Sequence, residues 1–380
     1  MRIERPDFLT YSQGGRKVEL PLPDAAAQAH SARLLERIRA AIAEAGGVIS
    51  FRRYMDMALY APGLGYYMAG QNRLGADGDF VTAPEMGSVL ARVLVRVLTP
   101  LLQSEASSDG ILEFGAGRGA LAQQIHQCLP EVPYTILELS PDLQEQQRTA
   151  LPGLRHLQQL PERWRGVMLA NEVLDAMPVR VVERDAGGQL RERAVRCNGE
   201  GLEWDWMPEP YAEAIDPGLT PLLMAEWPEH YRTELHPLAS AWLREIATCL
   251  QAGALILMDY GHEAGEYYHP QRQSGSLRAY YRQHWLDDPF YWPGLCDLTA
   301  HVNFSALLEA APDLGLEVQF YGNLARFLVE HGLAEVYAEL TAGLDTQGLL
   351  VLNNEIKRLT LPQEMGESFK VLILHKRASA

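Results

Sequence analysis

The stretch "ILEFGAGRGALAQQI", residues 111–125, decides the fold because three glycines stand at alternate positions directly after a short apolar run. The apolar run predicts a strand, and the overlapping segment "RGALAQQIHQCL" predicts the helix that follows it. Gly115 allows a sharp turn after the strand, and Gly117 lets the backbone approach a ligand. Gly119, or Ala120 beside it, allows close packing of the helix. The stretch therefore predicts a ligand-binding turn between a strand and a helix.

Strands and helices alternate along the chain beyond this turn. Further strands are predicted from apolar runs at residues 133–139, 166–178 (ending in a polar loop), 253–261, 316–322 and 367–376. Helices are predicted between them at residues 140–151, 234–251 and 303–315. This alternation predicts an α/β fold, in which a mostly parallel, Rossmann-like sheet carries helices on both faces. Ligands of such sheets bind beyond the carboxyl ends of the strands.

The chain is predicted to divide near residue 105. Residues 1–105 are expected to form a helical and lid region, and residues 106–380 a Rossmann-like domain. Two segments interrupt the alternation of that domain. Residues 182–233 are predicted to form an inserted arm or small subdomain. Residues 260–300 are predicted to form a long loop, rich in Tyr, Trp, His and Arg, on the substrate side.

Composition restricts the partners and the location. Asp and Glu number 49 against 33 Lys and Arg, and the formal net charge of −16 makes a nucleic-acid partner unfavourable. The four cysteines form no CxxC pair, and His262, His269 and His284 do not fit the H-E-x-x-H pattern, so no metal site is predicted. Widely spaced cysteines fit a reducing compartment, and we expect a cytoplasmic location.

No membrane span is predicted. The most apolar stretch is "SVLARVLVRVLTPLLQ", residues 88–103, in which Arg92 and Arg96 interrupt the apolar run. Its apolar pairs recur every four positions, which indicates one face of a helix packed in a core. The first residues carry Glu4 and Asp7 and no apolar centre, so a secretion signal is not expected.

Two acidic residues indicate which ligand the glycine turn holds. Glu138 follows the next strand, where a carboxylate hydrogen-bonds a ribose diol, and both NAD and S-adenosylmethionine carry one. Glu113 lies two residues before the first glycine and suits a cationic ligand. S-adenosylmethionine has an ammonium and a sulfonium group, whereas NAD places a pyrophosphate near such a loop. We therefore predict S-adenosylmethionine as the cofactor. A nicotinamide oxidoreductase is the alternative that rests on the glycines alone.

Eight stretches in a fixed order give the chain a more specific resemblance. They are "FRRYMDMALYAPGLGYY", "GDFVTAPE", "LEFGAGRG", "ANEVLDAMPV", "LILMDYG", "GSLRAYYRQH", "PGLCDLTAHVNFS" and "EMGESFKVL". With them, from about residue 50 to the C-terminus, the chain resembles the MidA-like family of S-adenosylmethionine-dependent methyltransferases. The resemblance implies a class I methyltransferase fold. Two stretches depart from the family: "GSLR" stands where Gly-Thr-Leu-Arg is common, and "YGNLARFL" lacks a Thr-Gln pair.

The resemblance also implies a substrate. Mitochondrial members of the family are protein-arginine methyltransferases that act on a core subunit of respiratory complex I. The expected partner is therefore an arginine-containing protein, of which a respiratory complex I subunit is one candidate. A small molecule or RNA as the methyl acceptor is the first alternative. An assembly chaperone with a vestigial donor site is the second. Residues 182–233 have two open roles, formation of a homodimer and capture of the substrate.

The resemblance places "GDFVTAPE" over the donor site. Asp79, Thr82 and Glu85 are its candidates for contacts with the methionine or ribose groups. For Glu85 the alternative is a first-turn acid that the helix dipole stabilises. Gly65, Tyr66 and Tyr67, which precede this stretch, are candidates for a lid, and packing in a core is the alternative role of the two tyrosines.

The loop "NEVLDAMP" supplies the candidates for acceptor chemistry. A protonated guanidinium is a poor nucleophile, so an arginine methyltransferase needs carboxylates that grip it and localise its charge. Glu172 is predicted to hold the guanidinium, Asn171 to contact donor or acceptor, and Asp175 to be a further catalytic candidate. Helix capping or pairing with an arginine is the alternative for both acids. His301 is a catalytic candidate by analogy with the Thr-His-Trp loop of other arginine methyltransferases, and packing or helix capping is its alternative.

Overall fold

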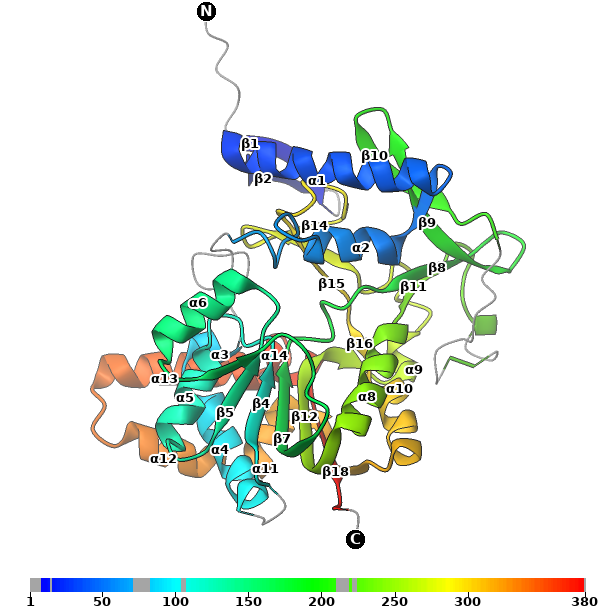
Figure 1. The fold of residues 1–380 in the computed structure, drawn as a ribbon. Helices are drawn as coiled ribbons and strands as arrows, with labels where there is room; N and C mark the ends of the chain where they lie inside the picture. The colour runs from blue at the N-terminus through cyan, green and yellow to red at the C-terminus, as the bar shows by residue number, and fades with distance from the viewer. Residues whose placement is uncertain are drawn as a thin grey trace, which may run out of the picture.

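The central sheet is flanked by helices (Figure 1), and the glycine turn follows its strand β4. The computed structural model describes residues 8–13, 16–70, 83–103, 107–209, 219–220 and 224–378. The strand order is β17-β18-β12-β7-β4-β5-β6. The strands are β4 (Gly110–Phe114), β5 (Tyr134–Leu137), β6 (Arg155–Leu157), β7 (Trp164–Asn171), β12 (Leu250–His262), β17 (Glu317–Asn323) and β18 (Phe369–Lys376). Strands β4, β5, β6, β7 and β12 are parallel, and β18 runs antiparallel to β12 and β17. The predicted mostly parallel α/β fold is confirmed.

Helices cover both faces of this sheet because alternate residues of each strand point to opposite sides. Ile111 and Val167 pack on the face that holds α4 and α5, whereas Leu112 and Met168 pack on the face that holds α8 and α10. All five residues of β4 are buried, as expected for a strand with neighbours on both faces. The helices are α4 (Val89–Leu102), α5 (Ala120–Cys128), α6 (Pro141–Ala150), α8 (Pro237–Cys249) and α10 (Phe304–Ala310).

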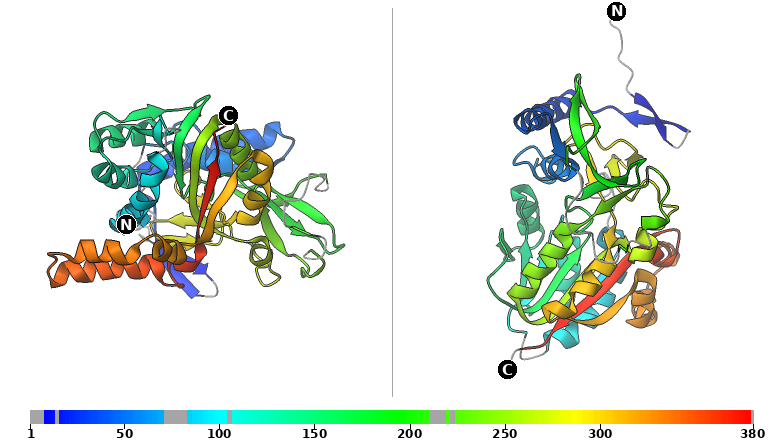
Figure 2. Two further views of the ribbon diagram at one scale, coloured as in Figure 1. Left: turned by 90° about the horizontal axis from the view of Figure 1, so that it is seen from below. Right: turned by 90° about the vertical axis from the view of Figure 1, so that its right-hand side faces the viewer.

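Four helices near the C-terminus were not predicted from the sequence. They are α11 (Leu324–Glu330), α12 (Leu333–Thr341), α13 (Thr346–Thr360) and α14 (Met365–Ser368). Helices α12 and α13 form a hairpin that projects to one side of the molecule, drawn in orange and red (Figure 2). The hairpin is attached to α4, because Val336 and Leu352 join the core around it and Glu355 accepts the backbone N–H of Val89 over 2.7 Å.

A second layer lies over the carboxyl ends of the central strands (Figures 1 and 2). Its larger sheet has the order β10-β9-β8-β11, with β3 paired to β9. The elements are β3 (Val48–Ser50), β8 (Arg180–Arg184), β9 (Leu190–Asn198), β10 (Gly201–Trp206), β11 (Arg232–Leu235), α1 (Ala25–Glu44) and α2 (Phe51–Tyr60). Ile49 and Tyr54 from the N-terminal part share one core with Val181 and Val195 from the inserted part.

Residues 260–300 do not form the structureless loop that the sequence predicted. They contain α9 (Ala264–Tyr267) and a three-stranded antiparallel sheet of β13 (Arg278–Tyr281), β14 (His284–Leu286) and β15 (Asp297–Thr299). Tyr281, Leu286 and Leu298 are buried in the core shared with α2. These strands have three or four residues each, which is too short to show a readable alternation of apolar and polar positions.

The remaining elements are peripheral or short. They are the antiparallel strands β1 (Phe8–Gln13) and β2 (Arg16–Pro21), helix α3 (Ala83–Met86), strand β16 (Val302–Asn303), which pairs with β12, and the 3₁₀ helix η1 (Pro312–Leu314). Among the residues that the structure describes, no helix combines the length and the apolar character needed to cross a bilayer.

Candidate active site

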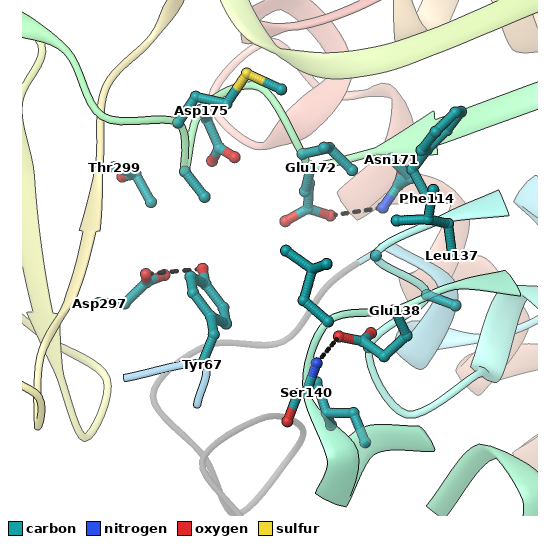
Figure 3. A pocket seen from close by; sticks show the side chains of 18 of the residues that line it. Tyr67, Phe114, Leu137, Glu138, Ser140, Asn171, Glu172, Asp175, Asp297 and Thr299 are labelled. Atoms are coloured by element: carbon teal, nitrogen blue, oxygen red, sulfur yellow. Dashed lines mark hydrogen bonds between the residues drawn. The ribbon is translucent and has the colours of Figure 1, made fainter. Parts of the chain in front are cut away.

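A cavity of about 1290 Å³ lies between the carboxyl ends of the central strands and the layer above them (Figure 3). The sheet contributes Phe114, Leu137 and Asn171, which stand at or next to the ends of three strands. The layer above contributes Tyr60 and Asp297. A small-molecule pocket usually has about 300–1,000 Å³, so this cavity has room for a donor and an acceptor side by side.

Most of the predicted site residues line this cavity. They are Glu85, Glu113, Gly115, Gly117, Glu138, Asn171, Glu172, Asp175 and His301. Gly119 is outside the cavity lining and stands as the N-cap of α5. Asp79 and Thr82 lie outside the residues that the structure describes.

The three glycines of the turn are required by their backbone angles. Gly115, Gly117 and Gly119 have φ of +57°, +53° and +83°, a left-handed region that residues with a Cβ adopt rarely. The close packing predicted for Gly119 is wrong. A Cβ there would lie 3.5 Å from Cγ of Gln147, which is ordinary van der Waals contact. The three glycines are therefore needed for the backbone conformation of the turn, and the backbone at Gly115 and Gly117 faces the cavity.

Glu113 is buried next to the end of β4 and faces the cavity. The Tyr134 hydroxyl donates a hydrogen bond to its Oε2 over 2.8 Å. Burial raises the pKa of Glu113 to about 7 because the ionised carboxylate loses its water, although the bond from Tyr134 acts in the opposite direction. A cation bound beside Glu113 would restore the ionised form.

Glu138 follows β5 and is also buried. Its Oε1 accepts the backbone N–H of Ser140 over 2.9 Å (Figure 3), and its Oε2 accepts a bond from the Gln147 side chain over 3.3 Å. Burial raises its pKa, and these bonds to the ionised form act against that rise. The carboxylate is thereby fixed at the wall of the cavity.

Gln147, on α6, is a functional candidate that the sequence reasoning missed. Its side-chain nitrogen donates to the carbonyl oxygen of Gly117 over 2.7 Å as well as to Glu138. Its side-chain oxygen lies 3.0 Å from Nε2 of His156. One fully buried amide therefore joins the glycine turn to the acid of the next strand. A polar residue on the inner side of the predicted helix 140–151 was the signal that could have found it.

The loop after β7 is held from both sides. Asp259 Oδ2 accepts the backbone N–H groups of Leu174 and Asp175 over 2.9 and 3.2 Å. Nε2 of His236 lies 2.8 Å from the carbonyl oxygen of Leu174, and burial lowers the pKa of His236 to about 4, so a neutral imidazole donates this bond. Glu172 has φ of +53°, a conformation that costs about 1–3 kcal/mol and persists only where its surroundings impose it.

The surroundings of Glu172 would favour a bound cation beside its carboxylate. Its carboxylate accepts a bond from the Asn171 side chain over 3.2 Å (Figure 3) and another from the backbone N–H of Ala83. Burial, and then the charge of Asp175, raise the pKa of Glu172 to about 8. Within the described part of the chain, neither Glu172 nor Asp175 forms an ion pair with an arginine, which disfavours local pairing as their role.

Asp175 is buried on the same loop and lines the cavity. Burial raises its pKa well above the usual value, and the charges of Asp259 and Asp297 add to the rise. Because several acids share one buried region, a positively charged ligand there would be stabilised by all of them.

His301 lies at the cavity wall as a neutral ring. Burial lowers its pKa to about 3. The ring stacks near Tyr260, with centroids 6.4 Å apart, and packs beside His262 at 5.1 Å. Its backbone N–H donates to the hydroxyl of Ser276 over 2.9 Å. His301 is therefore packed among other side chains, as its alternative role predicted, and it also lines the cavity.

The cavity wall is strongly acidic. The described residues that line it include eight carboxylates and two arginines, Arg118 and Arg278. The carboxylates belong to Asp56, Glu85, Glu113, Glu138, Glu172, Asp175, Glu245 and Asp297. Within the described ranges, no three His, Cys, Asp or Glu side chains are gathered closely enough to hold a metal ion. The cavity thus favours organic cations over phosphate-rich ligands.

Comparison with known proteins assigns the family. A family model described as "Putative S-adenosyl-L-methionine-dependent methyltransferase" matches residues 89–322, which is more than half of the chain. The chain belongs to this methyltransferase family. A crystal structure from Burkholderia thailandensis, bound to S-adenosyl-homocysteine, has 39% sequence identity and a TM-score of 0.85, and the match covers 95% of this chain and 96% of that one.

Two curated members of related sequence carry a more specific name. The mitochondrial protein arginine methyltransferase NDUFAF7 of Danio rerio is 27% identical over 86% of this chain and 83% of its own length. The homologue from Drosophila melanogaster is 26% identical over 98% of this chain and 92% of its own length. The predicted resemblance to the MidA-like methyltransferases is confirmed, and so is the predicted cofactor, S-adenosyl-L-methionine.

Proposed function

We propose that this methyltransferase transfers the methyl group of S-adenosylmethionine to an arginine guanidinium of a protein partner. The observation that carries the proposal is the half-buried carboxylate of Glu172, which lies in a cavity wall with eight acids and has no arginine paired to it among the described residues. A guanidinium cation would compensate this charge and would donate hydrogen bonds to the carboxylate.

The donor end of the cavity fits the cofactor. Glu138 is positioned to accept the ribose hydroxyls, and Glu113 to hold the ammonium group of the methionine part. The backbone of the turn at Gly115 and Gly117 leaves space beside them. When bound, S-adenosylmethionine supplies an electrophilic methyl group on its sulfonium. Two of the cavity's acids thus suit the donor, and Glu172 lies beyond them in the same cavity.

The acceptor end explains why an arginine is favoured. Glu172 stands between the donor acid Glu138 and the acids Asp175 and Asp297 (Figure 3). A carboxylate that bonds one edge of a guanidinium localises its positive charge there, so that a nitrogen on another edge keeps lone-pair character for an in-line attack on the methyl carbon. The N–C bond forms as the methyl–sulfur bond breaks, S-adenosyl-homocysteine leaves, and the methylated nitrogen releases one proton to a cavity carboxylate or to solvent. Asn171, bonded to Glu172, orients that carboxylate.

The related proteins support the same chemistry. Those from Danio rerio and Drosophila melanogaster are named protein arginine methyltransferases. An arginine-containing protein is therefore the proposed acceptor, and a subunit of respiratory complex I is the candidate that the family resemblance supplies. Eight acids in the cavity wall disfavour RNA as the acceptor, because phosphates would be repelled.

The test uses Glu172→Gln, which keeps the shape of the side chain and removes its charge. Wild-type and variant protein are incubated with radiolabelled S-adenosylmethionine and a bacterial cell extract, and methylated arginine is identified by mass spectrometry. We expect the variant to bind S-adenosyl-homocysteine with wild-type affinity and to lose at least a hundredfold of the transfer to arginine, about 2.7 kcal/mol. Glu309→Gln, the same change on an exposed part of α10, should retain full transfer. Transfer retained by Glu172→Gln, or label found on another residue type, would refute the proposal.

A further inference from the structure

The acceptor end of the cavity contains a second pair of interacting polar side chains. Asp297, on β15, is shielded from solvent yet lines the cavity. The Tyr67 hydroxyl donates a hydrogen bond to its Oδ1 over 2.8 Å, although the two residues are 230 positions apart in the sequence (Figure 3). Asp297 is fixed through its backbone as well, because β15 pairs with β13 and places it opposite Tyr280. The sheet of β13, β14 and β15 and the segment after α2 thus present one carboxylate to the cavity.

This carboxylate faces the same space as the loop after β7. Figure 3 shows Asp297, Thr299 and Asp175 on one side of Glu172, and Glu138 on the other side. Asp297 lies close enough to Asp175 for its charge to raise the pKa of Asp175. Two buried acids this close repel each other, so an organic cation between them and Glu172 would relieve the repulsion.

The arrangement suits a flat cation better than a metal ion. A metal ion needs three or more ligands around a point, and the described residues contain no such group. A guanidinium is planar and carries five N–H donors in a fixed fork, so carboxylates on different sides can bond it at the same time. Tyr60 and Tyr67 add a stacked aromatic wall, with ring centroids 5.6 Å apart and planes 24° apart, and aromatic faces also attract cations.

We infer that Asp297 is a specificity-determining residue, which binds the acceptor guanidinium on the side opposite Glu172, and that Tyr67 is the positioning residue that holds it. This inference rests on the proposed function and adds to it a second recognition point. A lysine ammonium is compact and cannot reach carboxylates on two sides of the cavity with the same fork of donors. The pair thus selects arginine over lysine.

The test measures binding to the enzyme saturated with S-adenosyl-homocysteine. The probes are the tripeptides Gly-Arg-Gly, Gly-Lys-Gly and Gly-citrulline-Gly, titrated by calorimetry or followed by NMR at millimolar concentration. Citrulline has the shape of arginine without its charge. The variants are Asp297→Asn, Tyr67→Phe and Glu172→Gln, and the control is Asp288→Asn, which changes an acid of the same inserted segment outside the cavity lining.

We expect the wild type to bind the arginine peptide at least tenfold more tightly than the other two. A hydrogen bond to a charged group is worth enough that Asp297→Asn should weaken arginine binding about ten- to hundredfold. Tyr67→Phe should weaken it less, and should raise KM for the acceptor without changing kcat. Both variants should keep the wild-type affinity for S-adenosyl-homocysteine. If Asp297→Asn does not fold, as judged by circular dichroism, Tyr67→Phe carries the test.

The outcomes separate this inference from the proposed function. Arginine binding that is lost in Glu172→Gln but unchanged in Asp297→Asn and Tyr67→Phe would leave the proposed function intact and refute the role of Asp297. Equal binding of the arginine and lysine peptides would refute selection by the pair. No binding of the arginine peptide to the wild type, with S-adenosyl-homocysteine bound normally, would overturn both.

Discussion

Asp259, near the end of β12, accepts the backbone N–H of Leu174 over 2.9 Å. This bond attaches the loop after β7 to the neighbouring strand β12. The same oxygen accepts the N–H of Asp175, and the other oxygen accepts the N–H of Tyr260 over 2.8 Å. His236 bonds the carbonyl oxygen of Leu174 from the opposite side. Two residues far along the chain thus impose the conformation of the loop that carries the proposed acceptor carboxylate.

Asp259→Asn should therefore reduce catalysis more than cofactor binding. An amide offers one acceptor oxygen where the carboxylate offers two, and its NH₂ group would face a backbone N–H. We expect the free energy of unfolding to fall by about 1–3 kcal/mol. We expect kcat to fall at least tenfold, because the loop is no longer fixed, while the affinity for S-adenosyl-homocysteine changes less than threefold. Urea unfolding, steady-state kinetics and calorimetry measure the three quantities.

Asp109→Asn is the matched control for this loss. The Asp109 carboxylate accepts the backbone N–H of Arg165 over 2.7 Å, at the end of the sheet away from the cavity. This variant should lose stability and keep kcat. A kcat that fell equally in both variants would show that general destabilisation, and not the position of the loop, explains the effect of Asp259.

Gln147→Leu should weaken donor binding and leave the acceptor end unaffected. The change removes the bonds to the Gly117 carbonyl oxygen and to Glu138, so no side chain of α6 then links the glycine turn to the acid proposed to bind the ribose. We expect the Kd for S-adenosyl-homocysteine to rise roughly tenfold, about 1.4 kcal/mol, with kcat at saturating donor nearly unchanged. Gln144→Leu removes a bond to the backbone oxygen of Glu138 and one from Arg148, neither of which reaches the glycine turn, and should have a smaller effect. Equal effects in the two variants would count against the bridging role.

The sequence predicted the central sheet well because its strands are buried on both faces. Such strands appear as continuous apolar runs, and β4, β7 and β12 were all found in this way. The site acids at the strand ends followed, since parallel strands place their carboxyl ends at one edge. Glu113, Glu138 and Glu172 therefore could be predicted without a structure.

Contacts across long distances in the sequence could not be predicted. Asp297 reaches the cavity only because β15 pairs with β13 and the sheet of β13, β14 and β15 lies over the strand ends. The stretch "CDLTAHVNF" gives no period that places its acid. Gln147 was missed for a related reason, because its value comes from two partners on other elements.

The helices at residues 324–368 were missed because their apolar residues did not stand out as one pattern. Val329, Leu350 and Val351 are exposed, so the apolar positions of α11 and α13 do not mark a single buried face. The hairpin of α12 and α13 is attached instead through a few buried groups, among them Glu355.

Tyr134→Phe should change the pH dependence of donor binding. The pKa of Glu113 is raised to about 7, and the proposed ammonium partner needs the ionised form, so donor binding releases a proton and affinity rises as pH increases through about 7. Removing the Tyr134 hydroxyl removes a bond that lowers the pKa of Glu113, which moves the rise to higher pH. Calorimetric titration with S-adenosylmethionine between pH 5.5 and 9 should show the rise in the wild type and its shift in the variant. Below the pKa, the affinity should change roughly tenfold per pH unit. A pH-independent affinity in the wild type would remove Glu113 from the donor site.

Gly87→Ala should destabilise the attachment of the hairpin. A Cβ at Gly87 would clash with Oε2 of Glu355, whose Oε1 accepts the backbone N–H of Val89. We expect a loss of about 1–3 kcal/mol in the free energy of unfolding. The double variant with Glu355→Ala should lose less than the sum of the two single losses, because the clash disappears. Gly265→Ala, in helix α9 with no atom within 4 Å of the added Cβ, should cost nothing. Additive losses in thermal or urea unfolding would show that Gly87 and Glu355 act independently.

The kcat/KM for the arginine acceptor should rise with pH up to about 8. The free enzyme holds Glu172 with a pKa raised to about 8, chiefly by burial, and only the ionised carboxylate grips a guanidinium cation. Below this pH each unit should therefore lower kcat/KM about tenfold. The positive charge of the bound sulfonium favours the ionised carboxylate and so shifts the pH-dependent part of the profile toward lower pH. Asp175→Asn removes a charge that raises the pKa of Glu172, so the rise of kcat/KM should shift to still lower pH. A profile that is flat between pH 6 and 9, with the donor saturating throughout, would mean that Glu172 does not bind the acceptor as an anion.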